Sequence, residues 1–534
     1  MGEGRVSYSA IAAFLLLQIT SFCSSSPLST NSRWIVDDAS GQRVKLACVN
    51  WPSHMEPMIA EGVEKKPLSE IAQKITANGF NCARFTWPTF MFTRPEYSNL
   101  RVSESLDKYN LSAARVGIVK NNPQILNMTV VELHKAVVDE LGRNKVMVVL
   151  DNHISRPGWC CGDKDGNGFF GDVDFSPEEW LQGLDAVANA YKVNPAVVGM
   201  SMRNELRGSR QNEADWYKYM ELGANTIHTQ NQDILVIVSG LGYAGNLGFL
   251  KSKPLAVSLA NKLVYEGHWY PFGIPADKWT SQTNQLCASV IKATSDNLLF
   301  LTQGDNSFPL FISEFGINQR GDNEADNRYI GCLLAAVAEL DLDWALWALQ
   351  GSYILREGTV NLEELYGVLD LNWDGIRNPQ FLDRLQVVQQ INQDFKSEHP
   401  TYYKMLHPLS GHCVQIVENE IVVASCKNAS QWEQHQDEGP IKLVGSPQCL
   451  GVAVDGEAPR VSEDCSSKWK FVSSSGLHLA AQVGNGGYLC LEMNTSDSKL
   501  VIKKCLCVGD NLGDLPTCAD NPQVQWFKFI PSNI

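Results

Sequence analysis

The segment from residue 32 to residue 405 alternates short apolar runs with longer amphipathic stretches, and this alternation is the feature that most constrains the fold. The runs are typical of buried parallel strands, because they are nearly continuous in valine, isoleucine and leucine. There are eight of them, at residues 44–51, 80–87, 145–153, 196–205, 234–240, 262–270, 309–315 and 342–349. Helical patterns separate most of them, for example at residues 67–79, 130–144, 177–193 and 326–343.

Alternation of strands and helices predicts an α/β fold with a parallel sheet, and eight units predict a closed (β/α)8 TIM barrel over residues 32–405. The alternative is an open doubly wound sheet. That fold usually carries a glycine-rich nucleotide-binding turn after its first strand, whereas the sequence here reads VNWPSHMEP. We therefore expect the barrel, with its active site at the carboxyl ends of the strands.

Residues 410–534 have a different character. Long helical patterns stop, short strand patterns alternate with turn residues, and tryptophans recur at positions 432, 469 and 526. The segments SPQCLGVA and GGYLCLEM look like two copies of one unit. Three imperfect units of roughly 40 residues predict a smaller all-β domain with a threefold, β-trefoil-like repeat.

This second region holds eight cysteines, and we expect them to pair among themselves. Short return loops favour pairing of Cys413 with Cys426 and of Cys449 with Cys465. Each of these loops would contribute roughly 3 kcal/mol in the chain-entropy description of a disulfide.

The first 26 residues are typical of a secretory signal peptide. Arg5 precedes an apolar segment, Ile11–Ile19, and small residues follow. The alternative, a signal anchor, needs ~20 apolar residues to span a bilayer. Fifteen cysteines are present, and removal of Cys23 with the signal leaves an even number, as an oxidising compartment favours. Sequons at Asn110, Asn127, Asn428 and Asn494 add the expectation of a secreted glycoprotein.

The formal net charge of −15 argues against two classes of partner. Nucleic-acid phosphates and anionic lipid both require a basic surface. We therefore expect no nucleic-acid partner and no membrane partner. Solubility alone also accounts for the acidity.

Two of the predicted strands end in a glutamate, Glu205 in VVGMSMRNEL and Glu314 in PLFISEFG. In a parallel barrel both would reach the active-site face. Enzymes that cleave glycosidic bonds usually use two carboxyl groups on such a face. One donates a proton, and the other attacks the anomeric carbon. The alternative is a buried, ion-paired structural role.

The first region closely resembles the family 5 glycoside hydrolases, the cellulase family of the clan-A barrels, over about 370 residues. The matching positions are Asn204-Glu205 on the fourth strand, Glu314 on the seventh, Arg84 on the second, His153 on the third, His268 and Tyr270 on the sixth, and Trp347 on the eighth. The resemblance implies hydrolysis with retention of configuration, without a metal or other cofactor. The carboxyl groups would then lie about 5–5.5 Å apart.

The resemblance also implies the supporting roles. Arg84 would keep the nucleophile Glu314 ionised. Tyr270 would donate a hydrogen bond to Glu314, and Asn204 would bind the sugar 2-hydroxyl. Trp347 would form a stacking floor for the sugar ring. For His153, His268 and Trp347 the alternative is core packing.

Two further motifs remain open. Glu266 shares a strand face with His268 and needs a buried partner, for which Arg203 is the candidate. The loop GWCCGDKDGNGFFGD holds the first half of a calcium-loop pattern but lacks its terminal glutamate. We expect instead a substrate loop tied down by Cys160 or Cys161, because disulfide geometry disfavours pairing of adjacent cysteines.

We therefore expect a secreted retaining β-glycoside hydrolase that acts on a polysaccharide or a β-linked glycoconjugate. One rival is a catalytically inactive carbohydrate-binding or scaffold protein, and another is a transglycosylase that uses the same site. The second region resembles the ricin-B-type β-trefoil lectins. Their Gln-x-Trp element reads SQW, SKW and VQW here, so glycan contact by this region is left open.

Overall fold

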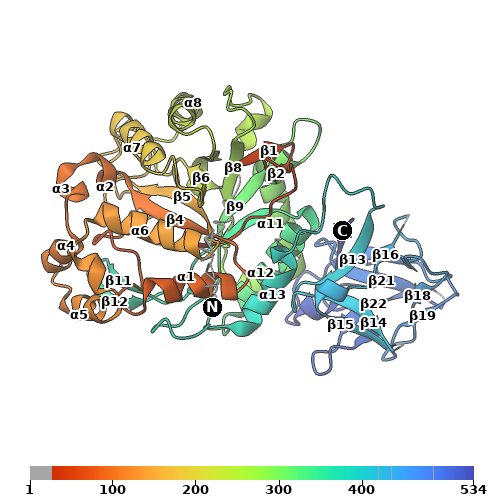
Figure 1. Ribbon diagram of the computed structural model, residues 1–534. Coiled ribbons are helices and arrows are strands. Elements are labelled where there is room, and N and C mark those ends of the chain that lie inside the picture. The colour runs from red at the N-terminus through yellow and green to blue at the C-terminus, as the bar shows by residue number, and fades with distance from the viewer. Residues whose placement is uncertain (1–26, 419, 435, 485) are drawn as a thin grey trace, which may run out of the picture.

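The computed structural model describes residues 27–418, 420–434, 436–484 and 486–534. The expected signal peptide lies outside the described residues. The chain forms an α/β barrel followed by an all-β region, which lies to one side of the barrel (Figure 1). This arrangement confirms the predicted fold class.

Eight parallel strands close the barrel in the order β10-β3-β4-β5-β6-β7-β8-β9. Closure occurs where β10 pairs with β3, with Trp344 opposite Ala47. Every predicted strand is present, and the strands are β3 (Ala47–Trp51), β4 (Cys82–Pro88), β5 (Met147–Ile154), β6 (Val197–Ser201), β7 (Leu235–Ser239), β8 (Leu263–His268), β9 (Leu310–Phe315) and β10 (Asp343–Leu346).

Helices cover the outside of the barrel. The helices are α1 (Leu68–Ala77), α2 (Thr89–Thr93), α3 (Pro95–Ser98), α4 (Val102–Lys108), α5 (Ser112–Asn121), α6 (Val130–Arg143), α7 (Pro177–Ala190), α8 (Glu213–Gln230), α9 (Leu241–Ala244), α10 (Ala276–Ser281), α11 (Thr283–Asn297), α12 (Glu324–Leu340) and α13 (Pro379–Gln389). Helices α6, α7, α8, α12 and α13 begin at side-chain caps that accept from the first free backbone amides, as Thr129 does from Glu132 and Ser176 from Glu179.

Two small hairpins accompany the barrel. One pairs β1 (Leu28–Asn31) with β2 (Trp34–Asp37). The other pairs β11 (Ser352–Arg356) with β12 (Thr359–Glu363), and it follows the eighth barrel strand. Among the described residues, no helix combines the length and the apolar character that crossing a bilayer requires.

The all-β region contains antiparallel strands and its own hydrophobic core, in which Trp432 and Trp469 are fully buried. One of its sheets begins with β13 (Tyr402–His407), which pairs with the last strand. The strands that follow are β14 (His412–Val417), β15 (Glu420–Ala424), β16 (Trp432–Glu433), β17 (Lys442–Leu443), β18 (Cys449–Gly451), β19 (Arg460–Ser462), β20 (Trp469–Val472), β21 (His478–Val483), β22 (Gly487–Met493), β23 (Leu500–Lys504) and β24 (Lys528–Ser532).

The cysteines of this region pair only with one another, as expected. The bridges are Cys413–Cys426, Cys449–Cys465, Cys490–Cys505 and Cys507–Cys518. The first two are the predicted pairs. The first three repeat one arrangement, in which a bridge closes a loop of similar length and a buried tryptophan follows it in the sequence.

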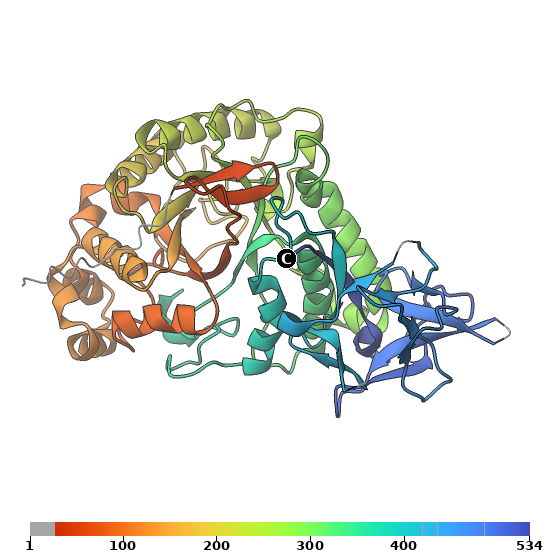
Figure 2. The same ribbon diagram turned by 45° about the vertical axis from the view of Figure 1, so that its right-hand side comes forward.

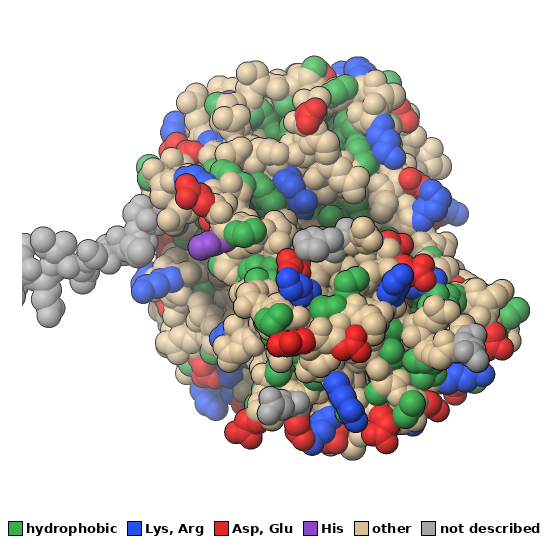
Figure 3. Space-filling view, turned by 90° about the vertical axis from the view of Figure 1, so that its right-hand side faces the viewer, with side chains coloured by type: hydrophobic (Ala, Val, Ile, Leu, Met, Phe, Trp, Pro, Cys, Tyr) green, Lys and Arg blue, Asp and Glu red, His purple; other side chains and the backbone are tan. Residues whose placement is uncertain are grey.

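The all-β region packs against α11, α12 and α13 (Figures 1 and 2). Helix α12 is buried on all sides because the barrel covers one face and the all-β region covers the other. Trp526 donates from Nε1 to Asn284 Oδ1 at 3.1 Å across this contact. Seen from the side of the all-β region, acidic and basic side chains are interspersed over the surface (Figure 3).

Candidate active site

The two glutamates reach the carboxyl-end face of the barrel from the fourth and seventh barrel strands. Glu314 lies inside β9, as expected. Strand β6 ends at Ser201, so Glu205 lies four residues beyond it rather than at its end. The difference arises because Met202 N donates to Ile237 O as the chain leaves β6 and Asn204 N donates to Asn152 O, so the segment turns across the top of the neighbouring strands.

His268 joins the two carboxyl groups. Its Nδ1 lies 2.8 Å from Glu205 Oε1 and 3.6 Å from Glu314 Oε2. Ligand-type atoms of these three residues all lie within 4.8 Å of one another, so one oxygen of each carboxyl lies within that distance of the other. The side chains of Glu205 and Glu314 are 13% and 7% exposed, which leaves both within reach of a substrate.

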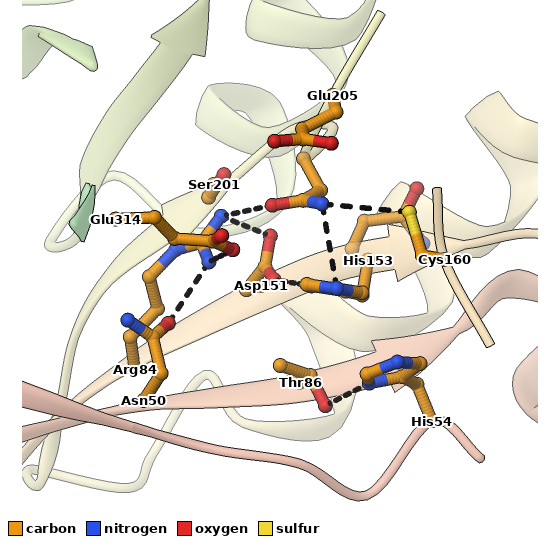
Figure 4. Close-up of polar contacts among 12 residues, drawn as sticks. Asn50, His54, Arg84, Thr86, Asp151, His153, Cys160, Ser201, Glu205 and Glu314 are labelled. Atoms are coloured by element: carbon orange, nitrogen blue, oxygen red, sulfur yellow. Dashed lines mark hydrogen bonds and ion pairs between the residues drawn. The ribbon is translucent and has the colours of Figure 1, made fainter. Parts of the chain in front are cut away.

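Arg84 sits under the pair and organises it (Figure 4). Its Nη1 donates to Glu314 Oε1 at 2.8 Å and to Asn50 Oδ1 at 2.9 Å. Its Nη2 donates to Asn204 Oδ1 at 2.8 Å. The sequence placed Arg84 at the end of the second strand, whereas it lies in the interior of β4. Its long side chain spans the remaining distance to the site.

Two more carboxylates lie beside the same guanidinium. Asp151 Oδ1 is 2.9 Å from Arg84 Nη2, and Glu266 Oε2 is 3.7 Å from it. Ser201 donates to the other oxygen of Glu266. The predicted Glu266–Arg203 pair is wrong.

Arg203 points the other way. It donates to Asn152, Ser155 and the Asn167 carbonyl, and it stacks over Phe175. Arg203 lies past the end of β6, where the chain has already left the strand alternation from which the pairing with Glu266 was inferred.

Burial controls the charges in this cluster. Loss of solvation raises the pKa of Glu205 to about 7, against the opposing effect of Arg207 and Arg84. It also raises the pKa of Glu314 to about 7, against the opposing effect of His268 and Arg84. Burial lowers the pKa of His268. Two carboxyl groups this close and this buried disfavour double ionisation, so we expect one proton on the pair near neutral pH.

The location of that proton follows from the donors. Glu314 accepts from Arg84 and lies 3.3 Å from the hydroxyl of Tyr270, which donates to Oε2. A carboxylate that receives a cation and a hydroxyl donor is favoured in its ionised form. Among the described residues, Glu205 accepts from neither Arg84 nor Tyr270. It contacts His268 Nδ1, whose lowered pKa favours the neutral imidazole, so we expect the shared proton on Glu205.

The remaining predicted site residues gather around this pair. His153 Nδ1 lies 2.6 Å from Asp151 Oδ2, and its Nε2 lies 3.4 Å from Asn204 Nδ2. Trp347 follows β10 directly and stacks on His153, with ring centroids 5.5 Å apart. The structure thus brings all eight predicted residues together.

The loop after His153 differs from expectation. Cys160 and Cys161 form a disulfide with each other, across a cis peptide bond that brings their Cα atoms to 3.1 Å. Both sulfurs face Asn204 Nδ2, at 3.8 and 3.6 Å. The expectation that one of them would tie the loop to a distant cysteine is wrong, because each sulfur already has the other as its partner.

The calcium-like carboxylates of this loop have protein partners. Asp165 pairs with Arg207, Asp174 with Arg156, and Asp163 accepts from the Tyr243 hydroxyl. The ligand-type atoms of His153, Cys160 and Cys161 also lie within 4.8 Å of one another. Sulfurs joined in a disulfide lack the thiolate that metal binding needs.

Several residues of the site were missed from the sequence. Asn50 holds Arg84 while donating to the backbone of Ser313 and Leu346. His54 stacks on His153 at 3.9 Å and hydrogen-bonds Thr86. Asn50 lies near the end of a predicted buried strand, and a polar side chain in such a position is the signal that could have found it.

Comparison with known proteins agrees with this geometry. The model of the family Cellulase (glycosyl hydrolase family 5) matches residues 38–352. A glycosyl hydrolase 5 family protein from Chamaecyparis obtusa is 42% identical over 544 residues, covering 98% of this chain and 96% of that protein. An endoglucanase from Paenibacillus polymyxa is 21% identical over 341 residues, covering 60% of this chain and 79% of that protein.

A solved structure shares the fold of the barrel. The hyperthermophilic endocellulase of the archaeon Pyrococcus horikoshii superposes with a TM-score of 0.56 at 17% identity, covering 69% of this chain and 99% of that chain. Fold, carboxyl pair and relatives together define a glycosidase, an enzyme that hydrolyses glycosidic bonds. The chain belongs to glycosyl hydrolase family 5.

Proposed function

We propose that the protein is a secreted, retaining β-glycoside hydrolase that cleaves β-linked glucan by double displacement. The observation that carries the proposal is the spacing of the two carboxyl groups, of which one oxygen each lies within 4.8 Å of the other. Retaining enzymes hold these groups about 5–5.5 Å apart, whereas inverting enzymes need about 6.5–9.5 Å to admit a water.

The first step uses the two glutamates in opposite states. Glu205 donates its proton to the glycosidic oxygen as the bond to the anomeric carbon breaks. Glu314 attacks that carbon and forms the glycosyl-enzyme ester. Arg84 holds Oε1 of Glu314 throughout, which leaves Oε2 as the attacking oxygen beside Tyr270.

The second step reverses these roles. Glu205, now ionised, removes a proton from water, and the water oxygen attacks the anomeric carbon and releases Glu314. Asn204 would bind the sugar 2-hydroxyl through its amide, whose carbonyl oxygen accepts from Arg84 and whose Nδ2 lies 3.4 Å from His153 Nε2. Trp347 and His153 provide a stacked floor for the ring.

The choice of β-glucan rests on the relatives. Two of the similar proteins are named endoglucanases, from Paenibacillus polymyxa and Xanthomonas campestris. β-Mannan and a β-linked glycoconjugate offer the same bond chemistry and are the competing substrates.

The proposal extends to location and to the second region. The seven disulfides among the described residues suit an oxidising compartment. Three of the four sequon asparagines, Asn110, Asn127 and Asn428, are exposed. The three repeated bridges of the all-β region support its assignment as a ricin-B-like β-trefoil. We propose that this region contacts glycans next to the enzyme.

The experiment measures reducing ends released from barley β-glucan, carboxymethyl cellulose and β-mannan, and follows the first product of an aryl β-glucoside by NMR. We expect activity on a β-glucan and a β-configured first product. Glu314→Ala, as the control, should lose turnover while keeping its melting temperature. An α-configured product would contradict the retaining mechanism.

The rivals give different results in the same assay. An inactive scaffold would release nothing from any substrate while still binding sugar. A transglycosylase would release the aryl group faster than free glucose, with the difference recovered as longer oligosaccharides.

A further inference from the structure

Arg207 is a fully buried arginine two residues after the proposed acid Glu205, and its donors reach both the acid and a neighbouring loop. Its Nη1 donates to the backbone carbonyl of Glu205 at 2.7 Å. Its Nε donates to the carbonyl of Gly162 at 3.1 Å, and its Nη2 donates to Asp165. Its backbone N donates to the carbonyl of Gly168 at 3.0 Å. One residue thus joins the segment of the acid to the loop of residues 155–176, the β5–α7 loop.

The β5–α7 loop also contacts the acid's segment on the other side of Glu205. The sulfurs of Cys160 and Cys161 face the Nδ2 atom of Asn204, at 3.8 and 3.6 Å. Further along the loop, Gly168 packs so closely that an added methyl group would lie 2.8 Å from the carbonyl oxygen of Arg207. The loop therefore lies against the residue before the acid and against Arg207 two residues after it.

Asp165, the acidic partner of Arg207, is held in place by its own loop. The backbone N of Gly162 donates to Oδ2 of Asp165 at 3.0 Å, and that of Asn167 donates to Oδ1 at 2.9 Å. The side chain of Arg207 is 0% exposed and that of Asp165 is 20% exposed, so solvent reaches only the acidic end of the pair. Two opposite charges are therefore fixed in the neighbourhood of the acid, where burial weakens the screening by salt.

Both charges act on the proton of Glu205. Burial is the largest influence and raises the pKa of Glu205 to about 7. Arg207 is the strongest of the opposing influences, and Asp165 acts in the same direction as burial. Among the described residues, further charged or titratable groups face Glu205 from other elements, and they are Arg84, Asp151, Tyr243, His268, Tyr270 and Glu314.

We propose that Arg207 is a positioning residue for the acid Glu205, because it fixes the backbone of the acid to the β5–α7 loop and, with Asp165, places a pair of opposite charges beside the acid. This inference rests on the proposed function, in which Glu205 protonates the glycosidic oxygen. Proton transfer requires both the right geometry and a proton held with the right strength. Arg207 serves both requirements, since the same guanidinium bonds the acid's backbone and carries the charge.

The first experiment separates support of the acid from general support of the fold. We would measure kcat/KM of Arg207→Met for phenyl β-glucoside and for 2,4-dinitrophenyl β-glucoside. Phenoxide needs a proton in order to leave, so a misplaced acid should lower kcat/KM for phenyl β-glucoside by about 10-fold or more. Dinitrophenoxide leaves without a proton, and its kcat/KM should stay within about threefold of the unsubstituted enzyme. Equal losses on the two substrates would overturn the positioning role.

The second experiment follows the alkaline limb of the pH profile of kcat/KM, which reports loss of the acid's proton in the free enzyme. Arg207→Met removes a cation and should move this limb to higher pH by about 1 unit. Asp165→Asn removes the opposite charge and should move the limb to lower pH by about half a unit. Arg207→Lys keeps the cation and should leave the limb within about 0.3 unit, although it loses the fork of donors. A merely structural role would not give shifts of opposite sign.

The variants Arg156→Met and Asp174→Asn are matched controls, because they break another ion pair of the same loop, whose Nε and Oδ2 atoms lie 3.1 Å apart. The side chain of Asp174 is 19% exposed, close to the value for Asp165. Neither control should move the limb or change the ratio between the two substrates.

The outcomes are decisive for each variant. If Arg207→Met does not fold, the limb of Asp165→Asn decides the question alone, because a substitution on the half-open side of the pair leaves the buried arginine in place. An unmoved limb in both active variants, or shifts of the same sign, would overturn this inference and leave the proposed function standing. An unsubstituted enzyme that cleaves no β-glucoside would refute the proposed function and this inference with it.

Discussion

The guanidinium of Arg84 faces more negative charge than it can balance. Asp151, Glu266 and Glu314 all lie within 4 Å of it, and all are buried. Burial alone would lower the pKa of Arg84, but the three carboxyls outweigh burial and raise it. Burial raises the pKa of both Asp151 and Glu266. A group of three buried carboxylates with one fixed cation is favoured when at least one carboxyl keeps its proton.

We expect that proton on Glu266. Its distance from Arg84 is the longest of the three, and its Oε2 is buried with no hydrogen-bond partner among the described atoms. Glu266→Gln should therefore keep kcat within about threefold, because an amide resembles a neutral carboxyl. Asp151→Asn removes the charge closest to Arg84 Nη2 and should lower kcat by about 10²-fold through misplacement of the arginine.

The pH profile of kcat/KM separates this prediction from simple loss of folding. Glu266→Gln should leave both limbs in place, since it removes a group that does not change charge in the working range. If Glu266→Gln instead shifted the alkaline limb by a full pH unit, Glu266 would be ionised in the working enzyme.

At the scale of elements, the loop after β3 carries two buried glutamates, Glu61 and Glu64, and Glu61 contacts the β11–β12 hairpin. Glu61 accepts from the backbone amide of Ile354 in β11 at 2.6 Å. Burial raises the pKa of Glu61 well above its usual range, and it raises that of Glu64 to about 7. An acid whose pKa rises on folding takes up a proton as the chain folds. Its stabilising effect is thus complete at low pH and is lost as pH rises through the folded pKa.

Glu64→Gln should accordingly remove part of the pH dependence of stability. We expect the melting temperature of the unsubstituted protein to fall between pH 5.5 and pH 8.5, and the variant to fall less. The surface residue Glu70, which pairs with Lys74 one helical turn away, supplies the control Glu70→Gln. The prediction fails if both variants follow the same curve as the unsubstituted protein.

The sequence predicted which strands are present better than it predicted the residues at which they end. All eight barrel strands were recoverable because each is a continuous apolar run, which a buried parallel strand requires. The position of Glu205 beyond β6 could not be predicted, because Met202 continues the apolar run after the strand has ended. The Arg203 contacts and the bridge between Cys160 and Cys161 depend on where the loop folds back, which no local pattern encodes.

For the whole molecule, the contact between barrel and all-β region was the part least visible in the sequence. Gly331 in α12 lies at this contact. A methyl group there would lie 2.3 Å from Gln523 Oε1, and Gln523 is fully buried. In the sequence, Gly331 is one small residue among several in a helical pattern. The segment that covers it, around Gln523, comes nearly two hundred residues later, so its role could not be predicted.

Gly331→Ala should therefore destabilise the protein, although alanine favours a helix over glycine by about 1 kcal/mol. In a Gln523→Ala background the same change should be neutral or stabilising, because the obstructing oxygen is gone. Thermal unfolding of the two single variants and the double variant measures this coupling. Gly487→Ala, where an added methyl meets nothing within 4 Å, is the control. Additive effects of the two changes would show that Gln523 is not what opposes the methyl group.

The pairing of β13 with β24 has a consequence for biosynthesis. Residue 402 lies opposite residue 532, so the first strand of the all-β region obtains this neighbour only after the intervening chain has been translated. At the usual elongation rates this interval is on the order of ten seconds. During it the free edge of β13 is a template for any other extended chain nearby. A message truncated shortly before the codon for residue 532 would therefore yield a barrel with an open, aggregation-prone sheet edge.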